Sequence, residues 1–449
     1  MKSKIPAVGS MQQLVSTSRY EEVIMIYSNA SARVLHRLVF CSILVASVLL
    51  AASSASAANL TVICPSGGPG AYPSITSALN AITNNAGPNS ITVSGTCTEN
   101  ILIRNQNDLN IQAAPGSTAV IANAANPAQI TVQLFGSRLV SFTGLSIQGG
   151  NPGVFVNQGS ELQMFNSVIE KNVGGGAEAL IKSDLNLISC IIRNNGGFGI
   201  LVGDSSVVMV MTPIQILNNN GPGAAAFSNG YIKFQGTGGH IIEGNAGGGV
   251  EADSEGHVFL QSDLPTVIRN NGGGGLVFVR GSTGRVDGQN TIENNGAVGV
   301  RVESSAVTFI GASAGSTITG HGFAGVDVSR GGELTFMGPH QITGNGNPTD
   351  GAGIRVERSS LIISLQDGAT VSNNIGSGIL GDANSGIVLG PTASVTNNTS
   401  TGIRLRHKSL VGLTAPVTIQ GNGGANIACD STSLAYGQLA GITGVHCEQ

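Results

Sequence analysis

Three stretches near the middle of the chain decide the fold: "IRNNGGGGLVF" (268–278), "IENNGAVGVRV" (292–302) and "ITGHGFAGVDV" (318–328). Each starts with Ile, passes through Asn or His and small residues, and ends in apolar residues that frame a variable one. Similar segments recur at steps of 23 to 29 residues. A fixed period of this size is typical of a solenoid. The aligned residues are Asn172, Asn195, Asn219, Asn245, Asn271, Asn295, His321, Asn345, Asn374, Asn398 and Asn422.

The repeats contain short strands rather than helices. In "GVRVES" the apolar Val300 and Val302 alternate with Arg301 and Glu303, which is the two-residue period of a half-buried strand. Asn-Asn and Asn-Gly pairs between the strands tolerate left-handed backbone. The sequence therefore predicts an all-β fold, a parallel β-helix solenoid. Each repeat would form one coil of about three strands, stacked at about 4.8 Å on the next.

The N-terminal region has the order of a secretory signal. Arg33, His36 and Arg37 precede an apolar run at 38–52, and small residues follow it. The run is shorter than the roughly 20 residues of a membrane span, so we expect export to the cell surface or the medium. The alternative is an uncleaved leader, which would anchor the protein to a membrane.

The expected organisation has four parts: a leader at 1–57, an N-terminal cap and first coil at 58–115, β-helix repeats at 116–428 and a C-terminal cap at 429–449. In the N-terminal cap, Ser74 can cap an amphipathic helix that would plug the open end of the core.

Five cysteines lie outside the leader. An exported chain permits disulfides, and we expect Cys64 to pair with Cys97 and Cys429 with Cys447, one bridge at each end of the fold. Cys190 lies in the apolar segment "LNLISCIIR" and is expected to be a buried thiol. No Cys-x-x-Cys spacing occurs, so the sequence predicts no zinc site, and it indicates no cofactor.

The repeats and the first module, "YPSITSALNAI" followed by "ITVSGTCTENILI", resemble right-handed parallel β-helix proteins of the pectin-lyase-like superfamily. The resemblance covers roughly residues 59 to 430. Many such proteins open with Gly-x-Tyr-x-Glu. Here the stretch from Gly95 to Glu99 has Cys97 in place of the Tyr. The resemblance implies the fold and, by analogy alone, an activity on polysaccharides.

The tripeptide Gly320-His321-Gly322 is similar to one that holds a histidine beside the catalytic aspartates of polygalacturonases. The other motifs of those enzymes, Asn-Thr-Asp, Asp-Asp and Arg-Ile-Lys, are absent. His321 instead takes the position that Asn occupies in neighbouring repeats. We therefore interpret it as one odd rung in a ladder of stacked Asn side chains.

Charged residues form two columns on the outward side of successive repeats. The first contains Arg301, Asp327 and Arg355, and the second contains Glu303 and Glu357. Alternating charges on adjacent strands usually form a solvated, mutually paired face. The alternative is a groove in which Arg301 and Arg355 hold sugar carboxylates. In that groove Asp327, with Glu303 or Glu357, could act as acid and base.

Two functions remain open. The sequence favours a non-catalytic surface or extracellular scaffold whose partner would be a polysaccharide or cell-surface glycan. The alternative is a polysaccharide lyase or glycoside hydrolase with a divergent site, acting on acidic polysaccharide. Lys and Arg are not clustered and only 10% of residues are charged, which argues against a nucleic-acid partner. Oligomeric state cannot be inferred from these features.

Overall fold

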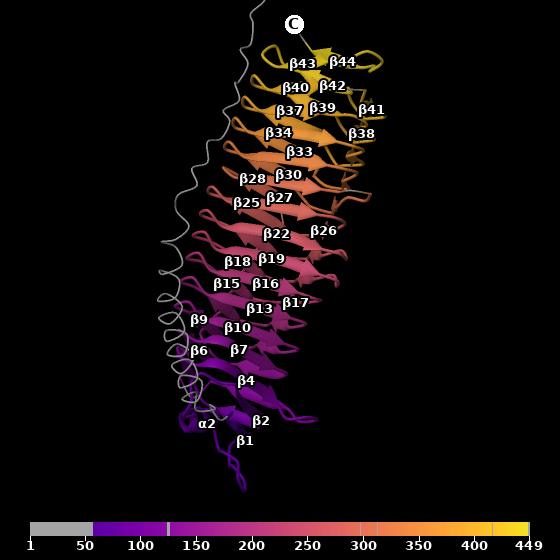
Figure 1. The fold of residues 1–449 in the computed structure, drawn as a ribbon. Coiled ribbons are helices and arrows are strands. Elements are labelled where there is room, and N and C mark those ends of the chain that lie inside the picture. The colour runs from indigo at the N-terminus through magenta and orange to yellow at the C-terminus, as the bar shows by residue number, and fades with distance from the viewer. Residues whose placement is uncertain (1–56, 124–125, 297, 312, 415, 448–449) are drawn as a thin grey trace, which may run out of the picture. The chain divides into compact units, whose positions relative to one another are not determined.

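The computed structural model describes residues 57–123, 126–296, 298–311, 313–414 and 416–447, so the predicted leader lies outside it except for its last residue. From Ala57 onward, coil stacks on coil in one continuous column (Figure 1). Within the described residues all strands pair in parallel, and the one helix is α2 (Ile75–Ala81). The prediction of an all-β parallel β-helix with a short N-terminal helix is confirmed.

Each regular coil contributes one strand to each of three faces. In the described part of the chain, the first face is a 15-stranded sheet. Its strands are β3 (Ile101–Arg104), β6 (Val132–Phe135), β9 (Val154–Asn157), β12 (Ala177–Ala179), β15 (Ile200–Val202), β18 (Ala224–Ala226), β21 (Val250–Ala252), β24 (Leu276–Val279), β27 (Val298–Glu303), β30 (Ala324–Ser329), β33 (Ala352–Glu357), β36 (Ser377–Asp382), β39 (Ile403–Leu405), β42 (Ile427–Cys429) and β44 (Val445–Cys447).

The second face follows the first in each coil. Its strands are β1 (Asn59–Ile63), β2 (Asn89–Thr98), β4 (Asn107–Ala113), β7 (Arg138–Thr143), β10 (Glu161–Phe165), β13 (Asp184–Ile188), β16 (Val207–Met211), β19 (Tyr231–Gly236), β22 (His257–Ser262), β25 (Thr283–Asp287), β28 (Ala306–Ile310), β31 (Glu333–Met337), β34 (Leu361–Gln366), β37 (Gly386–Leu389), β40 (Leu410–Leu413) and β43 (Leu434–Gly437).

The third face completes the coil, and the end of β2 joins it, because Gly95 to Thr98 pair with β5. Its other strands are β5 (Ala119–Ala122), β8 (Leu145–Gln148), β11 (Val168–Glu170), β14 (Ile191–Arg193), β17 (Gln215–Leu217), β20 (Ile241–Glu243), β23 (Val267–Arg269), β26 (Thr291–Glu293), β29 (Thr317–Thr319), β32 (Gln341–Thr343), β35 (Thr370–Ser372), β38 (Ser394–Thr396) and β41 (Thr418–Gln420).

The structure has more coils than the sequence pattern indicates. Counting the aligned Asn and His positions with one weaker copy gives about 12 repeats, whereas the first face has 15 strands among the described residues. The uncounted strands are β3 in the expected N-terminal cap and first coil, β6, and β44 in the expected C-terminal cap, none of which follows a copy of the full repeat motif. Hydrogen bonds along the strands hold these coils in register without it.

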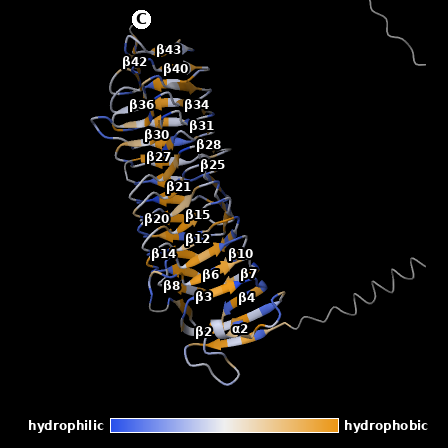
Figure 2. Cartoon of the chain, turned by 90° about the vertical axis from the view of Figure 1, so that its left-hand side faces the viewer, coloured by the Kyte–Doolittle hydropathy of each residue, from blue (hydrophilic) through white to orange (hydrophobic). Residues whose placement is uncertain are grey.

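The core is made of aliphatic residues that stack from coil to coil. Ile268, Ile292 and Ile318 occupy the same position in successive third-face strands, and all three are 0% exposed. Figure 2 shows hydrophobic residues concentrated in the strands. Burying one such side chain stabilises the fold by about 1.5–3 kcal/mol. The repeated Ile is therefore the main reason why the chain stays in register.

The predicted Asn ladder lies at the corner between the third and first faces. The side-chain amide of Asn271 donates to Oδ1 of Asn295 (2.8 Å) and to the carbonyl of Ile242 (3.2 Å). Its own Oδ1 accepts from the backbone N–H (3.0 Å) and the side-chain amide (2.9 Å) of Asn245. This pattern connects Asn172 to Asn295 and Asn345 to Asn422, with His321 between the two runs.

Backbone geometry determines which residues can flank each Asn of the ladder. The residue before the rung has positive φ, 55° at Asn270 and 75° at Gly320, a conformation that Asn and Gly tolerate. Close packing also requires a Gly after the turn. A Cβ on Gly275 would lie 2.8 Å from the side-chain nitrogen of Asn295. The Asn-Asn and Gly-Asn pairs in the sequence are thus explained by one turn.

The N-terminal cap has the predicted helix and a feature that the sequence did not reveal. The hydroxyl of Ser74 accepts from the N–H of Ser77 (3.1 Å), and Ile75 is fully buried. The Glu99 carboxylate accepts from the N–H groups of Ile75 (2.7 Å) and Thr76 (2.9 Å). Glu99 thus ties the first coil to the start of the helix, where a negative charge is favourable.

Both expected disulfides are formed, Cys64 with Cys97 and Cys429 with Cys447, while Cys190 is free and buried. The first bridge lies beside the capping helix, and the second joins β42 to β44 at the last coil. Both ends of the stack are therefore closed covalently. None of the helical segments in the described residues has the length and hydrophobicity needed to cross a bilayer.

Candidate functional site

The charged columns are confirmed as neighbours by the strand register. Arg301 of β27 pairs with Asp327 of β30, which pairs with Arg355 of β33, and Glu357 pairs with Asp382 of β36. We call the outward charged side chains of these strands and of β39, with those of the turns that follow them, the charged face. Its members are Arg301, Glu303, Asp327, Arg330, Arg355, Glu357, Arg358, Asp382, Arg404, Arg406, His407 and Lys408.

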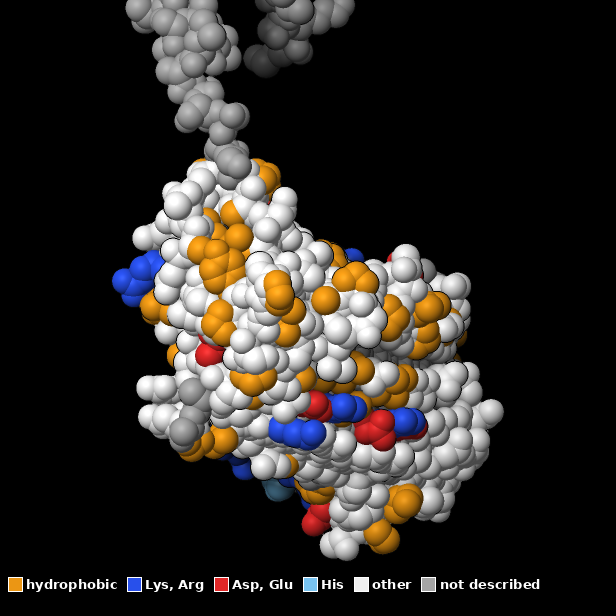
Figure 3. Space-filling view, turned by 90° about the horizontal axis from the view of Figure 1, so that it is seen from below, with side chains coloured by type: hydrophobic (Ala, Val, Ile, Leu, Met, Phe, Trp, Pro, Cys, Tyr) orange, Lys and Arg blue, Asp and Glu red, His pale blue; other side chains and the backbone are white. Residues whose placement is uncertain are grey.

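The ion pairs on this face run along strands and into turns more than across strands. Arg301 donates to Glu303 on the same strand (2.5 Å), and Arg355 donates to Glu357 in the same way (2.6 Å). The turn residues Arg330 and Arg358 contact the same two carboxylates from the outer side. Each glutamate is therefore held by two guanidinium groups. Seen from below, the molecule shows few charged side chains, and acidic and basic ones lie in contact there too (Figure 3).

Asp327 is left out of these pairs. Within the part of the chain that the structure describes, no cation lies within 4.0 Å of its carboxylate and no hydrogen bond reaches it. Burial raises the pKa of Asp327, an effect that Arg355 opposes and Glu357 reinforces. The opposite holds for Glu303: despite partial burial, hydrogen bonds from Arg301 and Arg330 lower its pKa. The pKa values of two carboxyl groups on adjacent strands are thus shifted in opposite directions.

Arg355 is held from two directions. Its guanidinium lies 5.0 Å from the centre of the Phe323 ring while Glu357 holds its Nε (3.0 Å) and Nη2. Stacking on one side and an ion pair on the other leave the group with a fixed orientation. Phe323 was not predicted as a site residue, since it lies in a turn position occupied by unlike residues in other coils.

A small cleft adjoins the charged face at its C-terminal end. The turn at 348–351 forms one side of it. Arg404 and Arg406 line the other side with the hydroxyl groups of Ser377 and Ser400. Arg406 also binds Asp382 (2.8 Å). The cleft therefore offers guanidinium and hydroxyl donors together.

His321 lies away from this face. Its side chain is 1% exposed, and its Nδ1 and Nε2 lie 3.3 Å and 3.1 Å from the carbonyl oxygens of Asn295 and Ile292. Burial lowers the pKa of His321, an effect that these carbonyls and Glu293 oppose. A buried ring between carbonyl groups has no access to a substrate, which supports its interpretation as a rung of the ladder.

Among the described residues, Cys64, Cys97 and Glu99 lie close enough together to be considered as ligands of a metal ion. The two cysteines are joined to each other, and Glu99 caps the helix. All three are thus accounted for by structural roles.

Comparisons with known proteins concern the fold. Residues 183–339 match the family described as right handed beta helix region. No curated protein matches the chain. The match over these residues and the parallel stacking of the described coils agree with the predicted fold, a right-handed parallel β-helix.

Similar solved structures include three polysaccharide-acting proteins. The mannuronan C-5 epimerase AlgE4 A-module of Azotobacter vinelandii is 14% identical, with 81% of this chain and 96% of that one covered (TM-score 0.44). The pectate lyase Pel9A is 12% identical, covering 86% and 83% (TM-score 0.35). The catalytic domain of a GH87 α-1,3-glucanase in complex with nigerose is 13% identical, covering 87% and 68% (TM-score 0.31). Likeness at this level carries no information about activity.

Proposed function

We propose that this right-handed parallel β-helix protein is an exported, non-catalytic scaffold that binds an acidic polysaccharide along the charged face. One observation carries the proposal: the face has seven Arg and Lys against four Asp and Glu, three positive charges in excess, in a chain of net charge -4. A local excess of cations in an acidic protein attracts a polyanion to that place. Two disulfides fit an oxidising compartment, which supports export.

The chemistry of the face suits sugar carboxylates. Arginine side chains bind carboxylates through charged hydrogen bonds, and Glu357 engages only Nε and Nη2 of the stacked Arg355, which leaves Nη1 for a ligand. A saccharide chain that runs across the strands would meet Arg301, Arg355 and Arg404 on every second coil, at steps of about 9.6 Å, twice the spacing of adjacent strands. Hydroxyl groups of Ser377 and Ser400 at the cleft could bind its ring hydroxyls. The ion pairs of Glu303 support the scaffold role, because a carboxylate held by two arginines is poorly placed to act as a base.

The test is binding of polygalacturonate and alginate oligosaccharides, with neutral oligosaccharides of the same length for comparison. Arg355→Ala and Arg404→Ala should each weaken acidic binding by about five- to tenfold, and raised salt should weaken it further. Arg269→Ala is the matched control, since Arg269 is an ion-paired arginine of the third face. Acidic binding that Arg355→Ala and Arg404→Ala leave unchanged, or an equal loss in the control, would contradict the proposal.

A second candidate function rests on the opposed pKa shifts of Asp327 and Glu303. Many hydrolases use a carboxyl group with a raised pKa as the acid and a neighbouring carboxyl group with a lowered pKa as the base or nucleophile. Depolymerase assays over acidic and neutral polysaccharides, with and without calcium, distinguish the two functions. For a scaffold, no cleavage is expected and Asp327→Asn changes nothing but stability, by less than about 1 kcal/mol. Cleavage that Asp327→Asn removes from a folded protein would establish the enzyme.

A further inference from the structure

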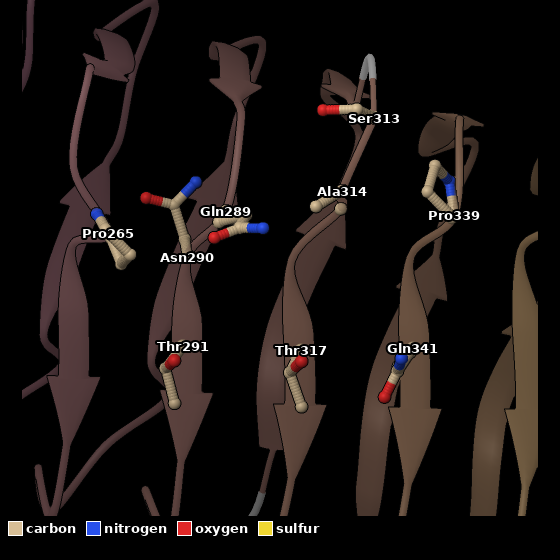
Figure 4. Close-up of a pocket in the computed structure, with 10 residues that line it drawn as sticks. Pro265, Gln289, Asn290, Thr291, Ser313, Ala314, Thr317, Pro339 and Gln341 are labelled. Carbon is tan, nitrogen blue, oxygen red and sulfur yellow. The ribbon is translucent and has the colours of Figure 1, made fainter.

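A cavity of about 350 Å³ lies on the third face, away from the charged face. It spans four coils at the start of β26, β29 and β32 (Figure 4). Pro265 and Pro339 belong to the outermost of these coils, and the loop with Ser313 and Ala314 rises beside it. The lining residues carry no charge: Pro265, Gln289, Asn290, Thr291, Ser313, Ala314, Gly315, Thr317, Pro339 and Gln341.

The polar groups of the cavity form a regular row. Thr291, Thr317 and Gln341 are the first residues of their strands and pair with one another in register. Within the described residues, none of these three side chains makes a hydrogen bond to protein. Two hydroxyl groups and a primary amide are thus presented at the spacing of adjacent strands, about 4.8 Å. They are free to bind a ligand that offers several hydroxyl groups.

The base of the cavity is rigid. Asn290 is 3% exposed, and its amide accepts from the N–H of Thr266 (3.2 Å) and donates to the carbonyl of Asp287 (2.9 Å). In the next coil, the N–H of Ser316, just before Thr317, donates to Nδ1 of His340 (2.9 Å). The row of Thr and Gln therefore stands on a hydrogen-bonded layer that needs no rearrangement when a ligand binds, which reduces the entropic cost of binding.

From these features we propose that the cavity binds a neutral pyranose unit of a glycan. An ionic ligand would lose hydration there without gaining a charged partner, whereas hydroxyl groups can exchange water for Thr and Gln. The proline rings supply flat apolar surface for the C–H face of a sugar ring. The volume is at the lower end of the roughly 300–1,000 Å³ of small-molecule sites, which fits one or two sugar units.

The experiment uses the whole protein with maltose, cellobiose and xylobiose as probes, followed by saturation-transfer NMR and calorimetry. We expect at least one of them to bind the wild type. The double variant Thr291→Val/Thr317→Val, which removes two hydroxyls and little volume, should bind it about tenfold or more weakly. Ala314→Phe, which fills the space, should abolish binding.

Thr418→Val is the matched control, because Thr418 is an exposed first residue of a third-face strand outside the cavity. It should bind the disaccharide as the wild type does. Binding of polygalacturonate to the charged face, measured in the same variants, should be unchanged, so the two proposals fail or hold independently. Absence of binding by all three probes at millimolar concentrations, or full binding by the double valine variant, would overturn the inference.

Discussion

Two corners of the same coils use different means of closing the turn. At the corner between the third and first faces, ten Asn residues repeat the same contacts in coil after coil, and His321 interrupts them once. At the corner between the second and third faces, the equivalent buried position changes from coil to coil: Ile214, His240, Thr266, Asn290, Ser316 and His340. We call the first the uniform corner, which fixes the stacking of the coils. We call the second the variable corner, which leaves room for the cavity of the third face.

The largest effect should come from breaking the uniform corner. Asn271→Ala removes the acceptor of Asn245 and the donor to Ile242 and Asn295, so four buried polar groups lose a hydrogen bond. Because each such group costs about 1–3 kcal/mol, we expect a loss of roughly 3–5 kcal/mol in the free energy of unfolding. Urea unfolding followed by circular dichroism measures it.

Ser316→Ala is the control at the variable corner, since it removes one hydroxyl that donates to the carbonyl of Gly288. It should cost about 1 kcal/mol. Similar losses in the two variants would mean that the Asn ladder is no more important than an isolated hydrogen bond.

The second effect concerns pH at the variable corner. The His240 side chain is 0% exposed, and neither ring nitrogen has a hydrogen-bond partner among the described residues. Burial lowers its pKa to about 4, an effect that the nearby carbonyl of Gln235 opposes. A lowered pKa means that the unfolded chain takes up a proton first as pH falls. The contribution of His240 to the free energy of unfolding is therefore fully present above about pH 6.5. It falls by about 3 kcal/mol between pH 6.5 and 4.

Unfolding of the wild type and of His240→Thr should be compared from pH 7.5 to 4. Thr is the residue at this position in the next coil. Burial lowers the pKa of His340 and His321 as well, so both proteins should lose stability in acid, and the difference in slope belongs to His240. Parallel pH profiles would show that His240 is solvated or paired in solution.

The two corners also show how far the sequence predicts this protein. The uniform corner was predicted because one residue type recurs at one spacing, and its turn geometry follows from Asn and Gly. The cavity could not be predicted, because Thr, Gln and Pro at 265–341 belong to no repeated motif and act only through the register of four coils. The charged columns were found from the register, but their pairing was not, since side-chain conformation decides that Arg301 binds Glu303 and leaves Asp327 free.

The smallest effect should come from making the uniform corner complete. In the described residues, the N–H of Asn295 lacks the acceptor that every earlier rung has, because His321 offers no side-chain oxygen. The neutral His321 ring can donate to only one of the two carbonyls that it faces. His321→Asn would supply an oxygen for Asn295 and rejoin the two runs of the ladder. The gain of about 1 kcal/mol from hydrogen bonds is partly offset by the lost volume of the ring.

We therefore expect His321→Asn to leave the free energy of unfolding at pH 7 unchanged or to raise it by up to about 1 kcal/mol. Asn295→His is the informative control, because it puts a second interruption next to the first and deprives Asn271 of its acceptor. That variant should unfold at clearly lower urea. If His321→Asn were the more damaging of the two, histidine would have a role at this rung that Asn cannot fill, and the uniform corner would not be purely structural.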